Sequence, residues 1–259
     1  MDFAAEMKGK RVIVTGAGGV IGRWLARAFA EAGASLCLTD TAVSGLEDME
    51  LGPHGFRHAA DLRDAAAIEA LAAAVVSRWG SADVLVNNAG VYPSAFLLDV
   101  DAAEWDRIFD INLRAPFLLT RAVAKGMIAA GVRGSVINIS SGAARKMRRT
   151  VAPYCTSKTA LDRITKGFAI ELAEYGIRVN ALEPGFAAGS SVSLVSEAHA
   201  ATTTANIPAG RATRYEDVRD AALFLAGSAS TYITGASLPV DGGNSIGSLA
   251  VYQDKKSAL

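Results

Sequence analysis

The stretch that decides the fold is R-V-I-V-T-G-A-G-G-V-I-G, which covers residues 11–22. Its first part, Arg11–Thr15, is an apolar, β-branched run that predicts a buried strand. Glycines follow, and from Ile21 apolar residues recur at three- and four-residue spacing until Gly33, which predicts a helix. A strand that turns through glycines directly into a helix is typical of the first βαβ unit of a parallel sheet.

The rest of the chain repeats this alternation of strand and helix. Successive strands joined through helices of this length pack as right-handed βαβ units. We therefore expect an α/β fold in one domain over residues 1–259: a Rossmann-like, doubly wound parallel sheet of about seven strands with helices on both faces. The expected strands are 11–15, 34–39, 56–60, 83–87, 134–140, 177–182 and 236–240, and the expected helices are 21–32, 64–79, 102–130, 154–175 and 216–226.

Composition excludes several classes of protein. The chain is 51% hydrophobic with 26 basic and 26 acidic residues, so nothing favours nucleic acid or an anionic membrane surface as a partner. No uncharged apolar run reaches membrane-spanning length. Cys37 and Cys155 have neither disulfide nor metal spacing, and the histidines form no ligand set, so no metal is expected. No secretory signal is visible, and we expect a cytoplasmic protein.

The glycines after the first strand are candidates for a nucleotide site. Gly16, Gly19 and Gly22 give the spacing G-x-x-G-x-x-G rather than G-x-G-x-x-G, because position 21 is Ile21. Glycines let the backbone turn tightly and approach a pyrophosphate at the N-terminus of the next helix. An ordinary glycine-rich turn is the alternative, but the strand before and the helix after favour a dinucleotide.

Asp40 follows the second expected strand, eighteen residues after Gly22. A carboxylate here accepts hydrogen bonds from an adenosine ribose and repels a 2′-phosphate. Positions 39–46 contain no Arg or Lys to receive that phosphate. We therefore predict NAD rather than NADP, with a plain turn residue as the alternative role of Asp40.

Polar and small residues also follow three other expected strands. Open α/β sheets bind ligands at the carboxyl ends of their strands, so these residues are candidates for cofactor contacts. Each group alone also fits turn chemistry. They are Asp61 and Leu62 after the third strand, Asn88, Ala89 and Gly90 after the fourth, and Pro184 and Gly185 after the sixth.

A second stretch, residues 141–158, carries the candidate chemistry. Pro153 suits the first turn of a helix, and Tyr154 and Lys158 are four residues apart, so they share one helix face. An ammonium near a phenol is expected to lower the pKa of Tyr154 toward neutrality, which lets the phenol give and take a proton. Ser141 precedes the helix and is placed to bond the same oxygen; an unremarkable surface pair is the alternative.

Together these motifs fall in the order and spacing of the short-chain dehydrogenase/reductases, which the chain resembles over residues 8–243. It is similar to the shorter branch of that family, typified by 3-oxoacyl carrier-protein reductases and by sugar and steroid dehydrogenases. The resemblance implies a homotetramer, with the long fourth and fifth helices paired between subunits.

The resemblance also implies residue roles. Tyr154 is the general acid/base, and Lys158 lowers its pKa and bonds the nicotinamide ribose. Ser141 orients the substrate oxygen, with Ser140 as the neighbouring alternative. Asn112 positions a water for proton relay. Without the resemblance, an Asn inside the helix expected over 102–130 either bends the helix, holds a water or lies on the surface.

The sequence departs from the family pattern in two places. Val20 stands where the shorter branch usually has glycine. In the family motif P-G-x-I-x-T, Ala187 replaces the Ile, and Gly189 replaces the Thr that helps hold the cofactor carboxamide. Ser190 or Ser191 is the expected substitute.

We expect an NAD(H)-dependent oxidoreductase that interconverts a secondary alcohol and a ketone. Residues 186–213 are the expected lid over the substrate, and residues 244–259 the expected loose tail. The alternatives are a 3-oxoacyl carrier-protein reductase that uses NADPH and a protein that senses NAD without turnover. The basic loop 145–149 either clamps an anionic substrate, is solvated or faces another subunit.

Overall fold

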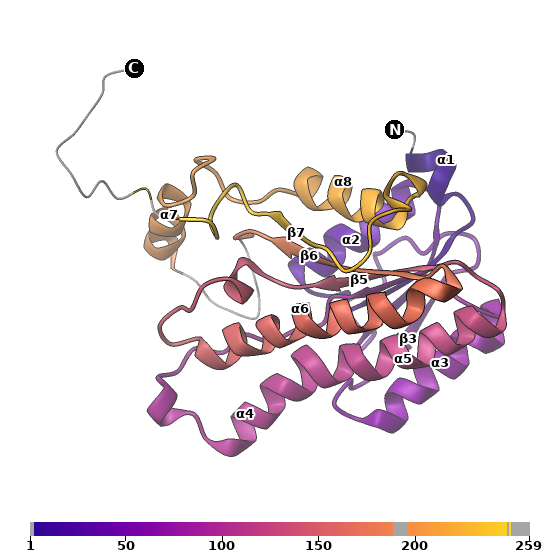
Figure 1. Cartoon of the computed structure of the whole chain (residues 1–259), viewed down its shortest axis with the longest axis horizontal. Helices are drawn as coiled ribbons and strands as arrows, with labels where there is room; N and C mark the ends of the chain where they lie inside the picture. The colour runs from indigo at the N-terminus through magenta and orange to yellow at the C-terminus, as the bar shows by residue number, and fades with distance from the viewer. Residues whose placement is uncertain (1–2, 189–195, 248, 250–259) are drawn as a thin grey trace.

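The computed structural model describes residues 3–188, 196–247 and 249. Within these residues the strands form one parallel sheet in the order β3-β2-β1-β4-β5-β6-β7 (Figure 1). The expected fold class is confirmed, and each expected strand lies within two residues of an observed one. The strands are β1 Arg11–Thr15, β2 Ser35–Asp40, β3 Phe56–Ala59, β4 Val84–Asn87, β5 Ser135–Ile139, β6 Arg178–Pro184 and β7 Ser237–Val240.

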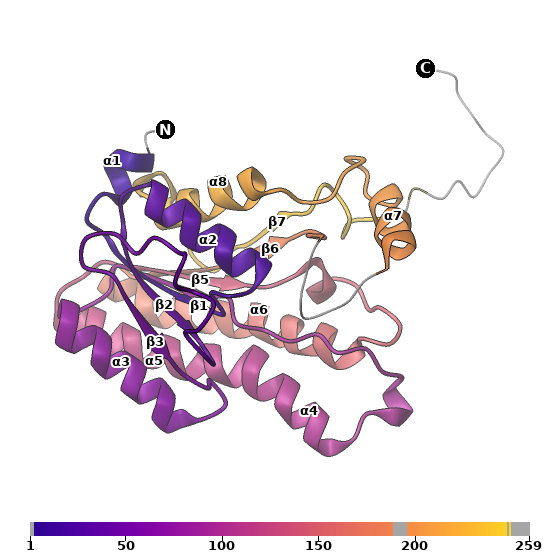
Figure 2. The same cartoon turned by 180° about the vertical axis from the view of Figure 1, so that it is seen from behind.

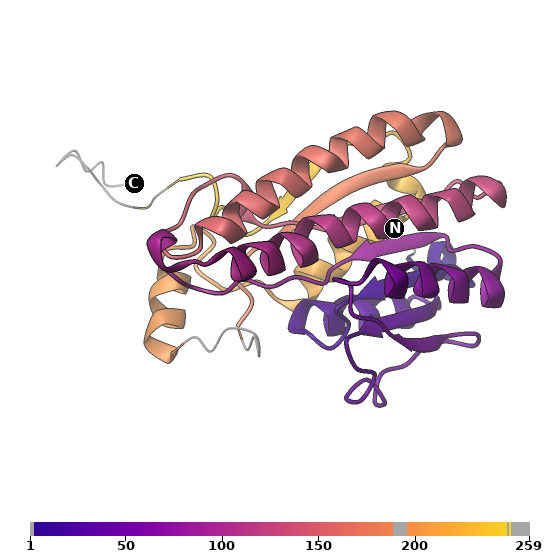
Figure 3. The same cartoon turned by 90° about the horizontal axis from the view of Figure 1, so that it is seen from below.

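Helices cover both faces of this sheet. Figures 1 and 2 show α2 (Val20–Glu31) and α8 (Tyr215–Ala226) together on one face. Seen from below in Figure 3, α3 (Ala65–Trp79), α5 (Ala115–Ala129) and α6 (Ala152–Leu172) run side by side on the other. This is the doubly wound arrangement that the alternation of strand and helix predicts.

The core divides into two clusters, one on each face of the sheet. Val12 and Val14 of β1 pack in the first cluster with Phe29 of α2, whereas Ile13 packs in the second with Leu119 of α5. Successive strand residues point to opposite faces, so a strand that is covered on both sides must be apolar throughout. Each fully buried aliphatic side chain contributes roughly 1.5–3 kcal/mol to folding.

The helix that the sequence predicts over 102–130 is not continuous. It consists of α4 (Ala102–Phe109), a π-helical turn over Asp110–Arg114, and α5. Asn112 lies in the widened turn, which agrees with its low preference for an α-helix interior.

Among the described residues, two α-helices were not predicted. The five-residue α1 (Phe3–Met7) lies near the N-terminus, and α7 (Glu197–Ala205) interrupts the Ser/Ala/Thr-rich region. The sequence of α7 has no apolar stripe and none of its residues is buried, so hydrophobic periodicity gives no signal for it. Across the described part of the chain, no helix is both long and apolar enough to cross a bilayer.

Candidate active site

The candidate catalytic side chains gather where β4, β5 and β6 end. Ser141 follows β5 and caps the short 3-10 helix Gly142–Ala144, where its hydroxyl accepts a hydrogen bond from the Ala143 amide at 3.1 Å. Tyr154 and Lys158 lie in the first turns of α6, which has Pro153 near its start as the sequence predicts. The parallel register brings these strand ends to one edge of the sheet.

Ser141 and Tyr154 are in contact. The Ser141 hydroxyl acts on the Tyr154 phenol as a hydrogen-bonding group that lowers the pKa of the phenol, and the ring of Tyr92 packs against the Tyr154 ring with centroids 5.7 Å apart. The hydroxyl of Ser140 is buried and has no hydrogen-bond partner among the described residues. The structure therefore favours Ser141 over its neighbour as the partner of the phenol.

The pKa of Tyr154 is raised, not lowered. Burial of the phenol disfavours the charged phenolate, and this effect outweighs the hydrogen bond from Ser141 and the positive charge of Arg148, which both lower the pKa. The expectation of a pKa near neutrality is therefore wrong for the chain on its own. Spacing along a helix does not reveal how deeply a phenol is buried.

Lys158 is the most strongly desolvated cation of the site. Its ammonium donates a hydrogen bond to the Ile139 carbonyl at 2.7 Å and lies 5.8 Å from the centre of the Tyr154 ring. Burial lowers the pKa of Lys158 to about 8, although the charge of Asp162 acts in the opposite direction. A Cβ atom at Gly90 would lie 3.5 Å from the ammonium, an ordinary contact distance, so Gly90 lies directly beside the lysine.

Asn112 is buried rather than on the surface. Its side-chain oxygen accepts from the Val91 amide at 2.8 Å, and its amide nitrogen donates to the Val91 carbonyl at 2.8 Å and to the Ser157 hydroxyl at 3.0 Å. The π-helical turn thus fastens the segment after β4 to α6. Fully bonded amides of this kind fix the geometry around them.

The glycine loop is packed tightly against the segment after β4. Gly16 has φ of +61°, and a Cβ atom there would lie 2.7 Å from the Ala89 Cα atom. At Gly22 a Cβ atom would collide with the Gly16 carbonyl. Val20, in place of the family's usual glycine, is the first residue of α2 and is only partly buried, as is Ile21, so both side chains are accommodated.

The residues around this loop fit a dinucleotide. Gly19 caps α2 without a side-chain hydrogen bond, which leaves first-turn amides for an anion. The Asp40 carboxylate accepts from the Gly18 amide at 3.0 Å and from the Thr41 amide at 2.8 Å. A pyrophosphate at the helix start and ribose hydroxyls at the carboxylate suit these groups.

Asn88 and Ala89 bind the end of β1. The Asn88 side chain donates to the carbonyls of Thr15 at 2.8 Å and Gly16 at 3.0 Å, and the Thr15 hydroxyl accepts from the Ala89 amide at 3.0 Å. These bonds position the glycine loop.

The remaining candidates after β3 have local partners. Asp61 forms an ion pair with Arg63 at 2.6 Å, and hydrogen bonds from Arg63 lower the pKa of the Asp61 carboxyl. Leu62 packs against the second core cluster.

Pro184 and Gly185 end β6 beside Thr213. The Gly185 amide donates to the Val240 carbonyl at 3.0 Å, and a Cβ atom at Gly185 would lie 2.6 Å from the Thr213 hydroxyl oxygen. Gly189, Ser190 and Ser191 lie outside the described residues. Sequence reasoning missed Thr213, which places a buried hydroxyl next to the Pro-Gly turn.

The basic loop 145–149 does not act as one clamp. Arg145 donates to both oxygens of Glu183, the shorter contact being 2.7 Å, and the Glu183 side chain is 0% exposed. Burial raises the pKa of Glu183, which Arg145 opposes. A buried carboxylate requires such a partner, so Arg145 is structural. Sequence reasoning missed Glu183, although an acid at the end of an apolar strand is a signal of this kind.

The tail is partly held in place. The Lys146 ammonium donates to the Asn244 carbonyl, and the Ser245 amide donates to the Asp241 carboxylate at 2.8 Å. The expectation of a loose tail is therefore wrong for residues 244–247, while most of residues 248–259 lie outside the described part.

Comparisons with known proteins agree with this geometry. A family model described as enoyl-(acyl carrier protein) reductase matches residues 16–245. A sorbitol dehydrogenase of Cereibacter sphaeroides is 34% identical over 252 residues, which cover 92% of this chain and 98% of the relative.

Two solved structures are also similar. A gluconate 5-dehydrogenase from Burkholderia cenocepacia J2315, in complex with NADP and tartrate, superposes with a TM-score of 0.86 at 33% identity, covering 94% of this chain and 98% of that one. A 3-ketoacyl-(acyl-carrier-protein) reductase from Brucella melitensis, complexed with NADH, has a TM-score of 0.83 at 34% identity, covering 93% of this chain and 100% of that one. The chain therefore belongs to the short-chain dehydrogenase/reductase family.

Proposed function

We propose that the protein is an NAD-dependent dehydrogenase that interconverts a secondary alcohol and a ketone on a small polyhydroxylated substrate. The observation that carries this proposal is the convergence of three groups: the Ser141 hydroxyl, which favours the phenolate of Tyr154, the partly buried Tyr154 itself, and the Lys158 ammonium, 5.8 Å from the centre of the same ring. The names of the sorbitol and gluconate dehydrogenases support the substrate class.

The proposed roles follow from what each side chain can do. A bound nicotinamide supplies or accepts the hydride. In reduction, Tyr154 gives its proton to the substrate oxygen as negative charge develops there, and the Ser141 hydroxyl stabilises that charge. The raised pKa of Tyr154 keeps the phenol protonated and ready to donate. In oxidation, the positive charge of Lys158 favours the phenolate that must form.

Asp40 supports NAD as the preferred cofactor. The two similar structures contain NADP in one case and NADH in the other, so family membership leaves the preference open. In this chain the Asp40 carboxylate is held at the glycine loop by the Gly18 amide. A 2′-phosphate at that place would meet a negative charge.

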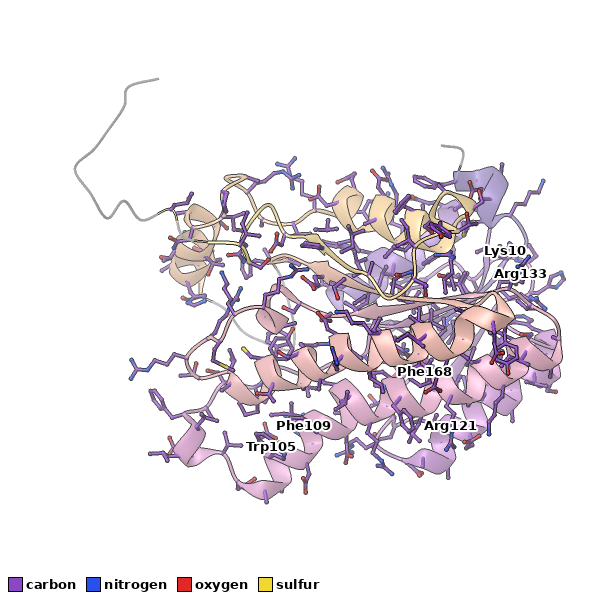
Figure 4. The ribbon with its side chains drawn as sticks, in the orientation of Figure 1. Lys10, Trp105, Phe109, Arg121, Arg133 and Phe168 are labelled. Atoms are coloured by element: carbon purple, nitrogen blue, oxygen red, sulfur yellow. The ribbon has the colours of Figure 1, made fainter. Side chains whose placement is uncertain are left out.

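We extend the proposal to the surroundings of the site. Residues 186–213, of which the structure describes 186–188 and 196–213, act as a lid. Asn112 holds a water for proton relay, and the protein works in the cytoplasm as a homotetramer. Exposed apolar side chains on the outer helices support subunit contacts: Trp105 stacks on Phe109 at 4.5 Å on α4, and Ile170 of α6 is 80% exposed (Figure 4 labels Trp105 and Phe109). Such patches are typical of interfaces.

The test is turnover by purified protein with NAD and NADP against matched alcohol and ketone panels, including a 3-oxoacyl thioester. We expect oxidation of polyols with NAD. The Tyr154→Phe variant should lose about 10²–10⁴ of kcat, because it has no proton to give, while cofactor affinity measured by calorimetry stays within about twofold.

The control is Tyr175→Phe, at an exposed tyrosine just beyond α6, which should leave kcat unchanged. Cofactor binding without turnover of any alcohol or ketone would support the sensor alternative instead. Preference for the 3-oxoacyl thioester with NADPH would support the carrier-protein reductase.

A further inference from the structure

The turn that carries Ser141 is short and ends at Arg145. Ser141 precedes the 3-10 helix Gly142–Ala144, and Arg145 follows it. The Ala144 amide donates to the Ser141 carbonyl at 2.9 Å. The Arg145 amide donates to the Gly142 carbonyl at 3.2 Å. Because these backbone hydrogen bonds close the turn, a displacement of Arg145 is transmitted to Ser141.

The side chain of Arg145 fastens this turn to the sheet. Its guanidinium donates to both carboxylate oxygens of Glu183, at 2.7 and 3.2 Å, and to the Ser237 carbonyl at 3.3 Å. Glu183 lies in β6 and Ser237 in β7, which are neighbouring strands. Paired hydrogen bonds from one planar guanidinium to one carboxylate fix orientation as well as distance. The turn is therefore tied to the strand ends in one orientation.

The same turn also rests on α6 and on the segment after β7. The Thr159 hydroxyl donates to the Ala144 carbonyl at 2.9 Å, and Thr159 directly follows Lys158 in α6. A Cβ atom at Gly142 would lie 2.8 Å from the Ser245 Cβ atom, so little space separates the turn from that segment. The turn is thus held from three directions, with the ion pair as its side-chain contact to β6.

The buried position of Glu183 favours a role in orientation over a role in stability. Its side chain is 0% exposed, and the desolvation of a buried ion pair can exceed the attraction between its charges. Apolar side chains of similar volume often stabilise a fold equally well or better. Apolar contact is non-directional, however, so it does not supply a fixed orientation for the turn.

Resting on the function proposed above, we propose that Glu183, acting through Arg145, is a positioning residue that holds the Ser141 hydroxyl at hydrogen-bond distance from the reacting substrate oxygen. Neither charged side chain touches the substrate. In reduction the Ser141 hydroxyl must face the oxygen on which negative charge develops. A displacement of about 1 Å at such a group can lower the rate about 100-fold.

The decisive variant replaces both charges with apolar side chains, Arg145→Met together with Glu183→Leu. Arg145→Met alone leaves Glu183 buried without its partner and should lose stability, so it does not separate the two roles. In the double variant the midpoint of denaturant unfolding should equal or exceed that of the wild type. Its kcat should fall about 10- to 100-fold, while the Kd for NAD measured by calorimetry stays within about twofold.

A double-mutant cycle tests whether the effect passes through Ser141. In a Ser141→Ala background, the two apolar substitutions should lower kcat less than about twofold, because no hydroxyl is left to position. Arg145→Lys keeps the charge but has no planar fork, and its kcat should lie between those of the wild type and the double variant. The control is Arg11→Met, at the ion pair to Asp83, which should lower stability without lowering kcat.

The outcomes distinguish two kinds of failure. Wild-type kcat in the double variant would overturn the positioning role, as would an equal fold loss of kcat with and without the Ser141 hydroxyl. If the double variant does not fold, the same cycle with Arg145→Lys decides. No turnover of any alcohol or ketone by the wild type with either cofactor would instead overturn the proposed function on which the inference rests.

Discussion

The two ends of the parallel sheet differ in what they offer a ligand. At the amino ends of β1 and β2 lies a hollow of about 770 Å³, bordered mainly by apolar surface and by Lys8, Gly33, His54 and Trp79. At the carboxyl ends lie the partly buried phenol of Tyr154, the desolvated Lys158 and the glycine loop. The hollow at the amino ends contains none of the candidate catalytic residues.

The difference lies in how completely the polar groups are paired. At the amino end the Arg11 guanidinium bonds the Asp83 carboxylate at 2.7 Å and the Trp79 carbonyl at 2.7 Å, and the Trp79 indole bonds the His54 carbonyl. At the carboxyl end burial shifts the pKa values of Tyr154 and Lys158. A site is marked by polar groups held in an unfavourable state rather than by empty volume.

Replacement of Lys158 is expected to have the largest effect on both turnover and stability, and it tests this difference between the two ends of the sheet. Burial lowers the pKa of Lys158 to about 8 from 10.5, so its charge costs about 3 kcal/mol at pH 7. Lys158→Met should reduce kcat by about 100-fold or more. It should also raise the free energy of unfolding by about 2 kcal/mol, after loss of the roughly 1 kcal/mol hydrogen bond to Ile139.

The pH dependence has a definite sign. Because the folded pKa lies below the unfolded one, the wild type gains stability as pH rises from about 8 toward 10.5. The Lys158→Met variant lacks this gain. Denaturant unfolding should therefore show a smaller difference in the free energy of unfolding between the two proteins at pH 9.5 than at pH 7. Lys166→Met, at an exposed lysine of the same helix, should change neither stability nor kcat. A Lys158→Met variant that is less stable than the wild type but still active would contradict the view that the carboxyl ends of the strands hold a desolvated catalytic lysine.

A smaller effect is expected at the amino end, on stability alone. Burial by itself raises the pKa of Asp83, but hydrogen bonds and charge from Arg11 outweigh it, and the pKa is lowered. Arg11→Met should cost roughly 2 kcal/mol of unfolding free energy, since the pair is partly buried, and leave kcat/KM within about twofold.

The stability that this pair supplies is present above the unfolded pKa of Asp83, about 4, and is lost as pH falls through the lower folded value. The difference between wild type and Arg11→Met should therefore shrink below pH 4 in denaturant titrations. Arg121→Met removes an exposed ion pair to Glu69 (Figure 4 labels Arg121) and should cost less than about 0.5 kcal/mol. Lost turnover in Arg11→Met would mean that the two ends are not independent.

The smallest effect is expected at Asp40, where charge acts on the choice of cofactor. Asp40→Asn keeps an oxygen for the Gly18 amide but removes the negative charge. The ratio of kcat/KM for NADP to that for NAD should rise about 10-fold, or about 1.4 kcal/mol. The control is Asp48→Asn, at an exposed partner of Arg23; an equal shift in both variants would assign the effect to net charge.

Local patterns predicted much of this molecule. The apolar run Arg11–Thr15, the glycines after it and the four-residue spacing of Tyr154 and Lys158 depend only on near neighbours in the chain, and the structure has them as expected. The pairing of Arg145 with Glu183 depends on the packing of the loop after β5 against β6, which spacing does not reveal. Spacing also does not reveal burial, which decides the direction of the Tyr154 pKa shift.

The ion pair between Arg145 and Glu183 also sets an order of events during synthesis. Arg145 additionally contacts the Ser237 carbonyl of β7, so the loop that carries Ser141 is fastened only after most of the chain has left the ribosome. The glycine loop and Asp40, by contrast, are made within the first forty residues. The residues of the glycine loop and its acidic partner are therefore synthesised well before the residues that complete the candidate active site.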